Sequence, residues 1–273
     1  MLKYRFTGGT AVVTGAAGAL GEQLAHGLAA RGSDLVLLDR DAARLDEVAR
    51  AIRDRFPESD VEPRVVDLAD LPGLAALADS VVAAHPRISL LVNSAGVAAG
   101  GTFERVTADE FDRVVAVAFL APVTLTRLLL PRLLRTPASH VVNVSGLFGL
   151  VAPAGRTAHA AGEFALRGFS ESLRHELADR GIGVTTVHAS GIRADARATG
   201  EPARASRFAK LIGYPADRAA QQVLRAVEYR KPRVLIAFPA HAADLLGRLA
   251  PRAGPAVLSR LQPDEHRDDA TTG

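Results

Sequence analysis

The chain has 273 residues, of which 48% are hydrophobic, so it is long enough to bury the core of one large α/β domain. Charged residues make up 23% and leave a net charge of +3, and we find no basic stripe with interleaved aromatic residues of the kind that binds nucleic acid. The absence of cysteine excludes disulfides, thiolate metal sites and cysteine catalysis. The first residues lack the apolar core of a signal peptide, and no apolar run approaches the roughly 20 residues that span a bilayer. We therefore expect a cytoplasmic protein without a metal.

Short apolar, β-branched runs alternate with longer segments of helical period almost to the end of the chain. Strands are predicted at 10–14, 34–38, 61–66, 88–92, 140–144, 183–188 and 233–236. Helices are predicted at about 19–31, 41–55, 70–84, 107–134, 156–180 and 215–229. Strands that are apolar throughout and separated by helices indicate a parallel sheet buried on both faces. The pattern predicts a doubly wound, Rossmann-type α/β fold of about seven strands with helices on both faces and its ligand at the carboxyl ends of the strands.

We expect a single domain over residues 1–262. Residues 191–213 are rich in Arg, Ala and Gly, show no clear strand, and follow the sixth strand, where a lid over the ligand crevice would lie. Residues 263–273 are polar and are predicted to be a disordered tail.

A glycine-rich turn joins the first predicted strand to the first helix. Gly15, Gly18, Leu20 and Gly21 lie in this turn, where a tight bend and free N–H groups at a helix N-terminus suit a pyrophosphate. The second strand ends in Asp39, where a carboxylate can hold the adenosine ribose hydroxyls and repel a 2′-phosphate. The turn therefore predicts a dinucleotide site that favours NAD, with NADP left open because Arg40 follows Asp39.

Two further motifs complete a set. Asp67-Leu68 follows the third strand and Asn93-Ser94-Ala95-Gly96 the fourth; with the glycine motif, in this order, they resemble the short-chain dehydrogenase/reductase superfamily over about residues 8–238. The resemblance implies that Asp67 and Leu68 flank the adenine, that Asn93 braces the central sheet, and that Ala95 and Gly96 belong to the cofactor site. The glycine motif departs from the family's common form, which has glycine where this chain has Ala19.

The same resemblance implies a catalytic set that this chain does not carry. Where the family has a proton-donating tyrosine and, four residues later, a lysine, this chain has His159 and Glu163. The serine position is Gly146, the asparagine position is Ala118, and the position of a nicotinamide-binding threonine is Ala194. Hydride transfer leaves an oxygen that must receive a proton in a dry site, so ordinary ketone reduction is not expected.

Three functions remain open. The first is a nucleotide-binding, non-catalytic or regulatory subunit, a candidate for pairing with an active relative. The second is a repurposed non-redox enzyme of elimination, isomerisation or retro-aldol type, in which His159 and Glu163 touch on one helical face as acid and base, with Ser145 as a further candidate. The third is an NAD(P)-dependent oxidoreductase with an atypical proton donor, for which Tyr214 and Lys210 are considered. Neither the substrate nor whether the chain is catalytic follows from the sequence.

The two long helices at 107–134 and 156–180 are apolar on more than one side. The family resemblance implies that they pack against the same helices of another subunit in a homo- or hetero-oligomer, although core burial also explains much of the pattern. A short amphipathic helix at 242–249 could extend such an interface or lie on a membrane surface.

Overall fold

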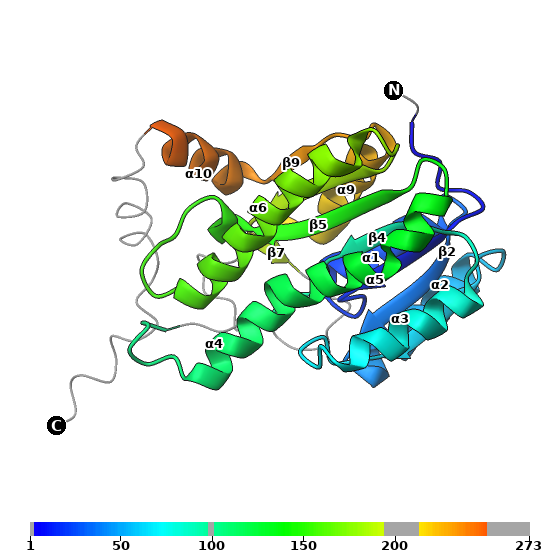
Figure 1. Cartoon of the computed structure of the whole chain (residues 1–273), viewed down its shortest axis with the longest axis horizontal. Coiled ribbons are helices and arrows are strands. Elements are labelled where there is room, and N and C mark those ends of the chain that lie inside the picture. Colours follow the sequence, from blue (N-terminus) through cyan, green and yellow to red (C-terminus); the bar gives the residue numbers. More distant parts are fainter. Residues whose placement is uncertain (1–2, 98–100, 194–212, 250–273) are drawn as a thin grey trace.

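A computed structural model describes residues 3–97, 101–193 and 213–249 (Figure 1). Its main sheet has seven parallel strands in the order β3-β2-β1-β4-β5-β6-β9. These strands are β1 (Thr10–Thr14), β2 (Asp34–Asp39), β3 (Val61–Val65), β4 (Ile88–Asn93), β5 (His140–Gly146), β6 (Gly183–Ala189) and β9 (Arg233–Ile236). The order reverses direction between β1 and β4, which creates the switch point where ligands bind in such sheets. The predicted fold class is confirmed.

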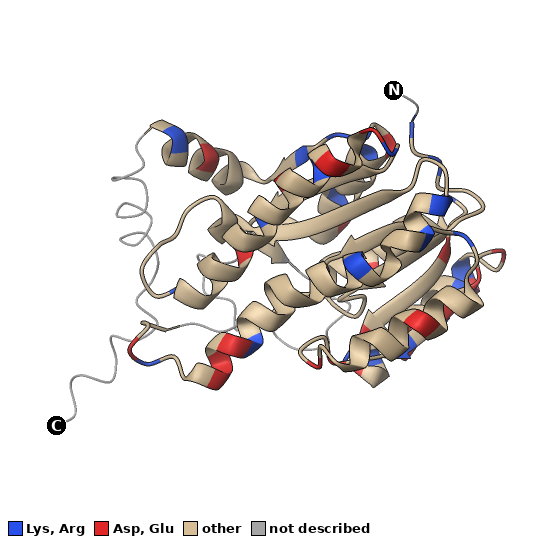
Figure 2. Cartoon of the chain, viewed as in Figure 1, with Lys and Arg blue, Asp and Glu red and all other residues tan. Residues whose placement is uncertain are grey.

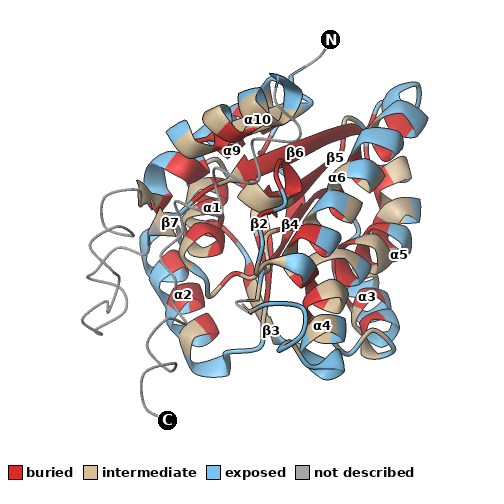
Figure 3. Cartoon of the chain, turned by 90° about the vertical axis from the view of Figure 1, so that its left-hand side faces the viewer, coloured by how far each residue is buried: buried red, intermediate tan, exposed pale blue. Residues whose placement is uncertain are grey.

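Helices cover both faces of this sheet. One face carries α1 (Ala19–Ala29), α2 (Ala42–Arg55) and α9 (Ala216–Glu228), whereas the other carries α3 (Gly73–Ala84), α5 (Ala121–Arg135) and α6 (Thr157–Ala178). The strand residues alternate between the two layers: Ala11 and Val13 of β1 pack with the first set of helices, and Val12 packs with the second. Figure 3 shows the buried strands between the two helical layers. This double burial explains why the central strands β1, β2 and β4 are apolar along most of their length.

The long helix predicted at 107–134 is continuous but not uniform. It comprises α4 (Ala108–Val115), a π-helical turn η1 (Ala116–Leu120) and α5. Thr107 begins it with a capping box, because its hydroxyl accepts from the N–H of Glu110 while the Glu110 carboxylate accepts from the N–H of Thr107. The stretch Ala108–Arg135 is long and apolar enough to cross a membrane, contrary to our expectation that no such run exists. Its buried residues, which include Val117, pack in the core beside the sheet, and this packing accounts for part of its apolar character.

The ends of the predicted lid form a small structure of their own. Ile192–Arg193 (β7) pairs in parallel with Tyr214–Pro215 (β8), which follows the predicted lid, so our expectation of a stretch without a strand was wrong at its N-terminal edge. Residues 194–212, which include Ala194 and Lys210, lie outside the described residues, as does the predicted tail at 263–273. The hydroxyl of Tyr214 is hydrogen-bonded by the Gln222 side-chain amide of α9 at 2.5 Å.

The last described helix, α10 (Phe238–Leu249), begins four residues earlier than predicted. Its inner face contributes Ala240 and Ala243 to a small apolar cluster with Leu150 and Val151, just after the short 3₁₀ turn η2 (Leu147–Gly149). Acidic and basic residues are interspersed along the helices in the view of Figure 2.

Candidate functional site

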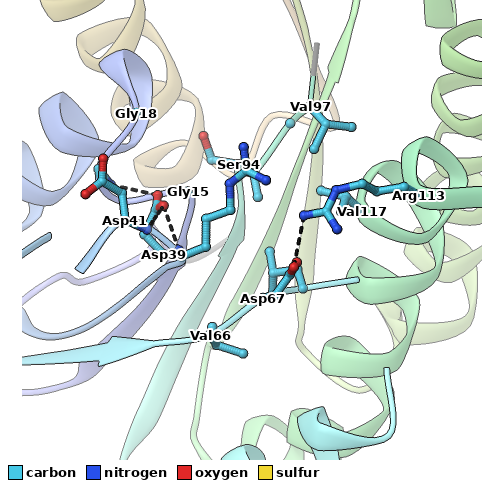
Figure 4. A pocket seen from close by; sticks show the side chains of 15 residues that line it. Gly15, Gly18, Asp39, Asp41, Val66, Asp67, Ser94, Val97, Arg113 and Val117 are labelled. Atoms are coloured by element: carbon cyan, nitrogen blue, oxygen red, sulfur yellow. Dashed lines mark hydrogen bonds and ion pairs between the residues drawn. The ribbon is translucent and has the colours of Figure 1, made fainter. Parts of the chain in front are cut away.

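A cavity of about 270 Å³ opens at the carboxyl ends of β1, β2, β3 and β4, beside the switch point (Figure 4). Eight of the residues that we assigned to a cofactor line this cavity: Gly15, Gly18, Asp39, Arg40, Asp67, Leu68, Ala95 and Gly96. Leu20, Gly21 and Asn93 do not line it and lie buried behind it. The structure thus brings most of the predicted cofactor residues together from four separate strand ends.

The glycine turn is shaped by close backbone packing. Gly15 has a φ of +67°, and a Cβ there would lie 2.7 Å from the Cα of Ala95. Thr14 completes the contact, because its Oγ1 accepts hydrogen bonds from the N–H groups of Ser94 (3.0 Å) and Ala95 (3.2 Å). The segment after β4 is therefore held directly against the turn after β1, and together they form one wall of the cavity.

Gly21 serves packing more than ligand contact. A Cβ at this position would lie 2.0 Å from the carbonyl oxygen of Gly15, so only glycine allows α1 to start this close to the turn. Gly18 is the N-cap of α1 and borders the cavity, which places the positive end of the helix at the opening. Ala19, the departure from the family's common motif, is not one of the lining residues.

The Asp39 carboxylate connects the end of β2 to the glycine turn and to the start of the segment that leads to α2. Its Oδ2 accepts from the N–H of Ala17 at 3.0 Å, and its Oδ1 accepts from the N–H groups of Arg40 (2.7 Å) and Asp41 (3.1 Å). These contacts hold a negative charge at the end of β2 and link it to the glycine turn. Asp41 in turn caps α2 by accepting from the N–H of Arg44.

Arg113 is a cavity residue that sequence reasoning missed. It reaches from α4 to Asp67, with its guanidinium 2.9 Å from the carboxylate, as Figure 4 shows. The Ala69 N–H and the Arg113 guanidinium hold the pKa of Asp67 below its usual range. Arg113 lies in a helix that we examined only for its apolar residues, and nothing in its spacing links it to Asp67, which is 46 positions earlier.

Asn93 lies inside the sheet. Its side-chain amide donates to Asn143 of β5 at 2.8 Å, and the Asn143 amide donates to the hydroxyl of Ser170 on α6 at the same distance. This chain of buried hydrogen bonds connects two central strands and one helix, in the way that a bracing role requires.

His159, at the position where the resemblance implies tyrosine, is half-buried near the start of α6. Its Nε2 lies 2.7 Å from the carbonyl oxygen of Val97. Because a carbonyl only accepts, this nitrogen must carry the proton. The ring of Phe148 lies edge-on to the imidazole, with 6.2 Å between centroids.

Glu163 does not pair with His159. Its carboxyl is turned toward the backbone of Gly146, Gly149 and Phe148, and burial raises its pKa to about 7 although those N–H groups oppose the rise. Oε2 is buried and has no hydrogen-bond partner among the described residues. Sharing a helical face permits contact at this spacing but does not enforce it, and the Glu163 carboxyl lies instead against Gly146, where a Cβ would be 2.5 and 2.8 Å from its two oxygens. The expected acid–base contact is therefore absent from the described structure.

Ser145, Ala118 and His188 also lie in packed surroundings. The hydroxyl of Ser145 donates to the backbone carbonyl of Glu163 at 3.4 Å and so faces α6. Ala118 lies in the π-helical turn, where a Cβ on Gly162 would come within 3.0 Å of the Ala118 Cβ, so the two helices are close at this point. His188 at the end of β6 is fully buried, and burial lowers its pKa to about 4.

A doubly wound parallel sheet with a cavity at its switch point defines a Rossmann-type protein. The sequence pattern described as short chain dehydrogenase matches residues 9–205. SadH of Mycobacterium tuberculosis is 33% identical over 89% of this chain and 91% of its own. Mouse dehydrogenase/reductase SDR family member 7B is 31% identical over 88% of this chain and 77% of its own. A solved metagenomic short-chain oxidoreductase in complex with NADP is 29% identical, with a TM-score of 0.70 and coverage of 85% and 98%. The chain belongs to the short-chain dehydrogenase/reductase family.

Proposed function

We propose that this chain binds a nicotinamide dinucleotide, with NAD favoured over NADP, and does not carry out ordinary hydride transfer between an alcohol and a carbonyl. On this proposal it acts as a non-catalytic or regulatory subunit that pairs with an active member of its family.

The nucleotide half of the proposal is supported by the cavity. Gly15 and Gly18 present bare backbone at the start of α1, and the positive end of that helix suits a pyrophosphate. The carboxylate of Asp39 suits ribose hydroxyls and repels a 2′-phosphate, whereas Arg40 would attract one. Because the carboxylate is held by three backbone N–H groups, we expect its negative charge to decide the preference. A related protein has been solved with NADP, so the preference must be measured.

One observation carries the chemical half. The Glu163 carboxyl lies so close to Gly146 that a Cβ on this glycine would be 2.5 and 2.8 Å from its two oxygens. Position 163 therefore supplies no ammonium, and position 146 supplies no hydroxyl and has no free space for one. A bound nicotinamide dinucleotide would supply or accept a hydride, but the residues beside it would lack the phenol and cation that complete the proton transfer.

A second candidate is an oxidoreductase that uses His159 as its proton donor. It is favoured by the name of the mouse relative, a dehydrogenase/reductase, and by a half-buried imidazole whose Nε2 bears a proton. The non-redox alternative with a His159–Glu163 pair has weaker support, because His159 is hydrogen-bonded to the carbonyl of Val97 and the Glu163 carboxyl lies against Gly146.

Fluorescence titration with NADH and NADPH tests the nucleotide half. We expect NADH to bind more tightly, and Asp39→Asn to shift the affinity ratio toward NADPH by about tenfold, which corresponds to about 1.4 kcal/mol. Equal binding of the two nucleotides by both proteins would contradict the assignment of Asp39.

Turnover tests the chemical half. We expect the wild-type protein to show none with NADH on a broad panel of aldehydes and ketones, and the variant carrying Ala118→Asn, Gly146→Ser, His159→Tyr and Glu163→Lys to gain some. Wild-type turnover that disappears in His159→Ala would overturn the proposal and establish the second candidate. Turnover that survives His159→Ala would overturn both.

A further inference from the structure

The cavity at the switch point extends from the glycine turn to the end of β3. Val66 and Leu68, which follow β3, line it together with Val117 of η1. The strand order β3-β2-β1 places Asp39, at the end of β2, between these residues and Gly15. A ligand with its phosphates at the start of α1 and a ribose at Asp39 would therefore carry its base toward β3. Apolar side chains from two separate segments suit the faces of a flat heteroaromatic ring.

An ion pair joins the two segments at this end of the cavity. The Nη2 of Arg113 on α4 donates to the Oδ2 of Asp67 at 2.9 Å, as Figure 4 shows, and both residues line the cavity. The Oδ1 of Asp67 accepts from the N–H of Ala69 at 3.0 Å. Because the backbone holds one carboxylate oxygen, the other oxygen offers the guanidinium an acceptor in a fixed place.

Most N–H groups of Arg113 are not used in this pair. A guanidinium has five N–H donors in one plane and no acceptor. Among the residues that the structure describes, Asp67 is the one acceptor that it reaches. The side chain is 40% exposed and borders the cavity, so the other donors can reach a bound ligand. Since the carboxylate restrains one end of the guanidinium, these donors are offered in a limited range of directions.

The ion pair is poorly suited to holding the fold together. The two side chains are 40% and 43% exposed, and an ion pair at such exposure contributes little to stability. The segments that it joins are already packed together, because Leu68 and Val117 belong to the same buried apolar cluster. The position of the pair at the cavity wall is therefore better explained by a ligand than by folding.

We propose that Arg113 recognises the adenine base of a bound dinucleotide by donating to a ring nitrogen, and that Asp67 is the residue that positions its guanidinium. Ring nitrogens of adenine are acceptors in the plane of the base, where a planar guanidinium can meet them edge to edge. The inference rests on the proposed function, since a dinucleotide must occupy the cavity.

The test is a fluorescence titration with NADH and with reduced nicotinamide mononucleotide, which lacks the adenosine half. Arg113→Ala should weaken NADH binding by about tenfold, the effect of one lost hydrogen bond to a charged donor, and leave binding of the mononucleotide unchanged. AMP, measured by its displacement of NADH, should weaken by the same factor. Arg127→Ala, which removes an exposed arginine of α5 that does not line the cavity, should change none of these affinities.

Arg113→Lys separates recognition of the base from simple attraction to phosphate. Lysine keeps the positive charge and can keep the ion pair, but it lacks the planar fork, so NADH should bind about as weakly as to Arg113→Ala. This conservative variant also carries the test if Arg113→Ala does not fold.

Asp67→Asn tests the positioning role. Once the carboxylate is gone, the guanidinium is no longer held, so Arg113→Ala should weaken NADH binding less in the Asp67→Asn background than in the wild type. A full, additive loss in that background would show that Asp67 does not position Arg113.

Base recognition is overturned if folded Arg113→Ala or Arg113→Lys binds NADH as the wild type does, or if NADH and the mononucleotide weaken equally. A wild-type protein that binds no nucleotide would instead overturn the proposed function, and this inference with it.

Discussion

At the scale of single residues, the chemical half of the site contains pairs in which the side chain of one residue fills the space beside a small residue. Glu163 fills the volume next to Gly146, and Ala118 lies close to α6 at Gly162. In each pair the small residue leaves room for the residue that it faces. The residues that stand in place of the family's catalytic set are therefore packed against one another. A change at one member of a pair is therefore expected to be felt at the other.

The buried carboxyl of Glu163 makes the stability of the protein depend on pH. Its pKa is raised from 4.5 to about 7 in the folded protein, so the neutral form is favoured by folding and stability falls as the pH rises from about 4.5 through 7. The full effect corresponds to about 3 kcal/mol. We expect Glu163→Gln to match the wild type near pH 4.5 and to be more stable at pH 8.

Urea denaturation of both proteins across this pH range measures the difference. The exposed carboxyl of Glu176 provides the control, because Glu176→Gln should follow the wild-type curve. If the free energy of unfolding changed with pH in the same way in the wild type and in Glu163→Gln, ionising the Glu163 carboxyl would cost no stability. The carboxyl would then not be buried as described.

At the scale of elements, the start of α1 is where helix and turn approach most closely. Gly21 faces the carbonyl of Gly15 at a distance that no side chain tolerates, whereas Gly168 in the middle of α6 has open space around it. Both are helical glycines, so they offer a matched pair in which helix propensity is the same and packing differs.

We expect Gly21→Ala to lower the free energy of unfolding by about 1–3 kcal/mol, because the backbone of the glycine turn must shift. Gly168→Ala should raise it by about 0.5–1 kcal/mol, because alanine favours the helix and meets nothing. Thermal unfolding monitored by circular dichroism distinguishes them. Equal shifts in the two variants would mean that α1 does not lie against the turn in the way described.

At the scale of the whole molecule, the two long helices present apolar side chains outward as well as inward. Leu120 and Phe164 are 38% and 40% exposed on the segments for which the family resemblance implied contact with another subunit. Assembly through these helices remains a prediction, and these two side chains give the means to test it.

Replacing Leu120 or Phe164 with arginine should shift the protein to monomer without lowering its unfolding temperature, because both side chains are partly exposed within one chain. Val65, 61% exposed on the edge strand β3, provides the control, since Val65→Arg should leave the assembly intact. Sedimentation velocity reports the change. An assembly that survives both helix substitutions would place the subunit contact elsewhere.

The sequence by itself determined the fold class, and it named most of the residues that line the cavity at the switch point. Strands that are apolar along most of their length require cover on both faces. Glycines between a strand and a helix place a turn at the sheet's edge, and both signals are local. Only the tertiary structure decided the partners of the polar side chains. Spacing along α6 places His159 and Glu163 on one face, but His159 is hydrogen-bonded to the carbonyl of Val97, which follows β4, and the Glu163 carboxyl lies against Gly146 at the end of β5. The contact between Arg113 and Asp67 could not be predicted for the same reason, because contacts between distant segments depend on how the helices pack on the sheet.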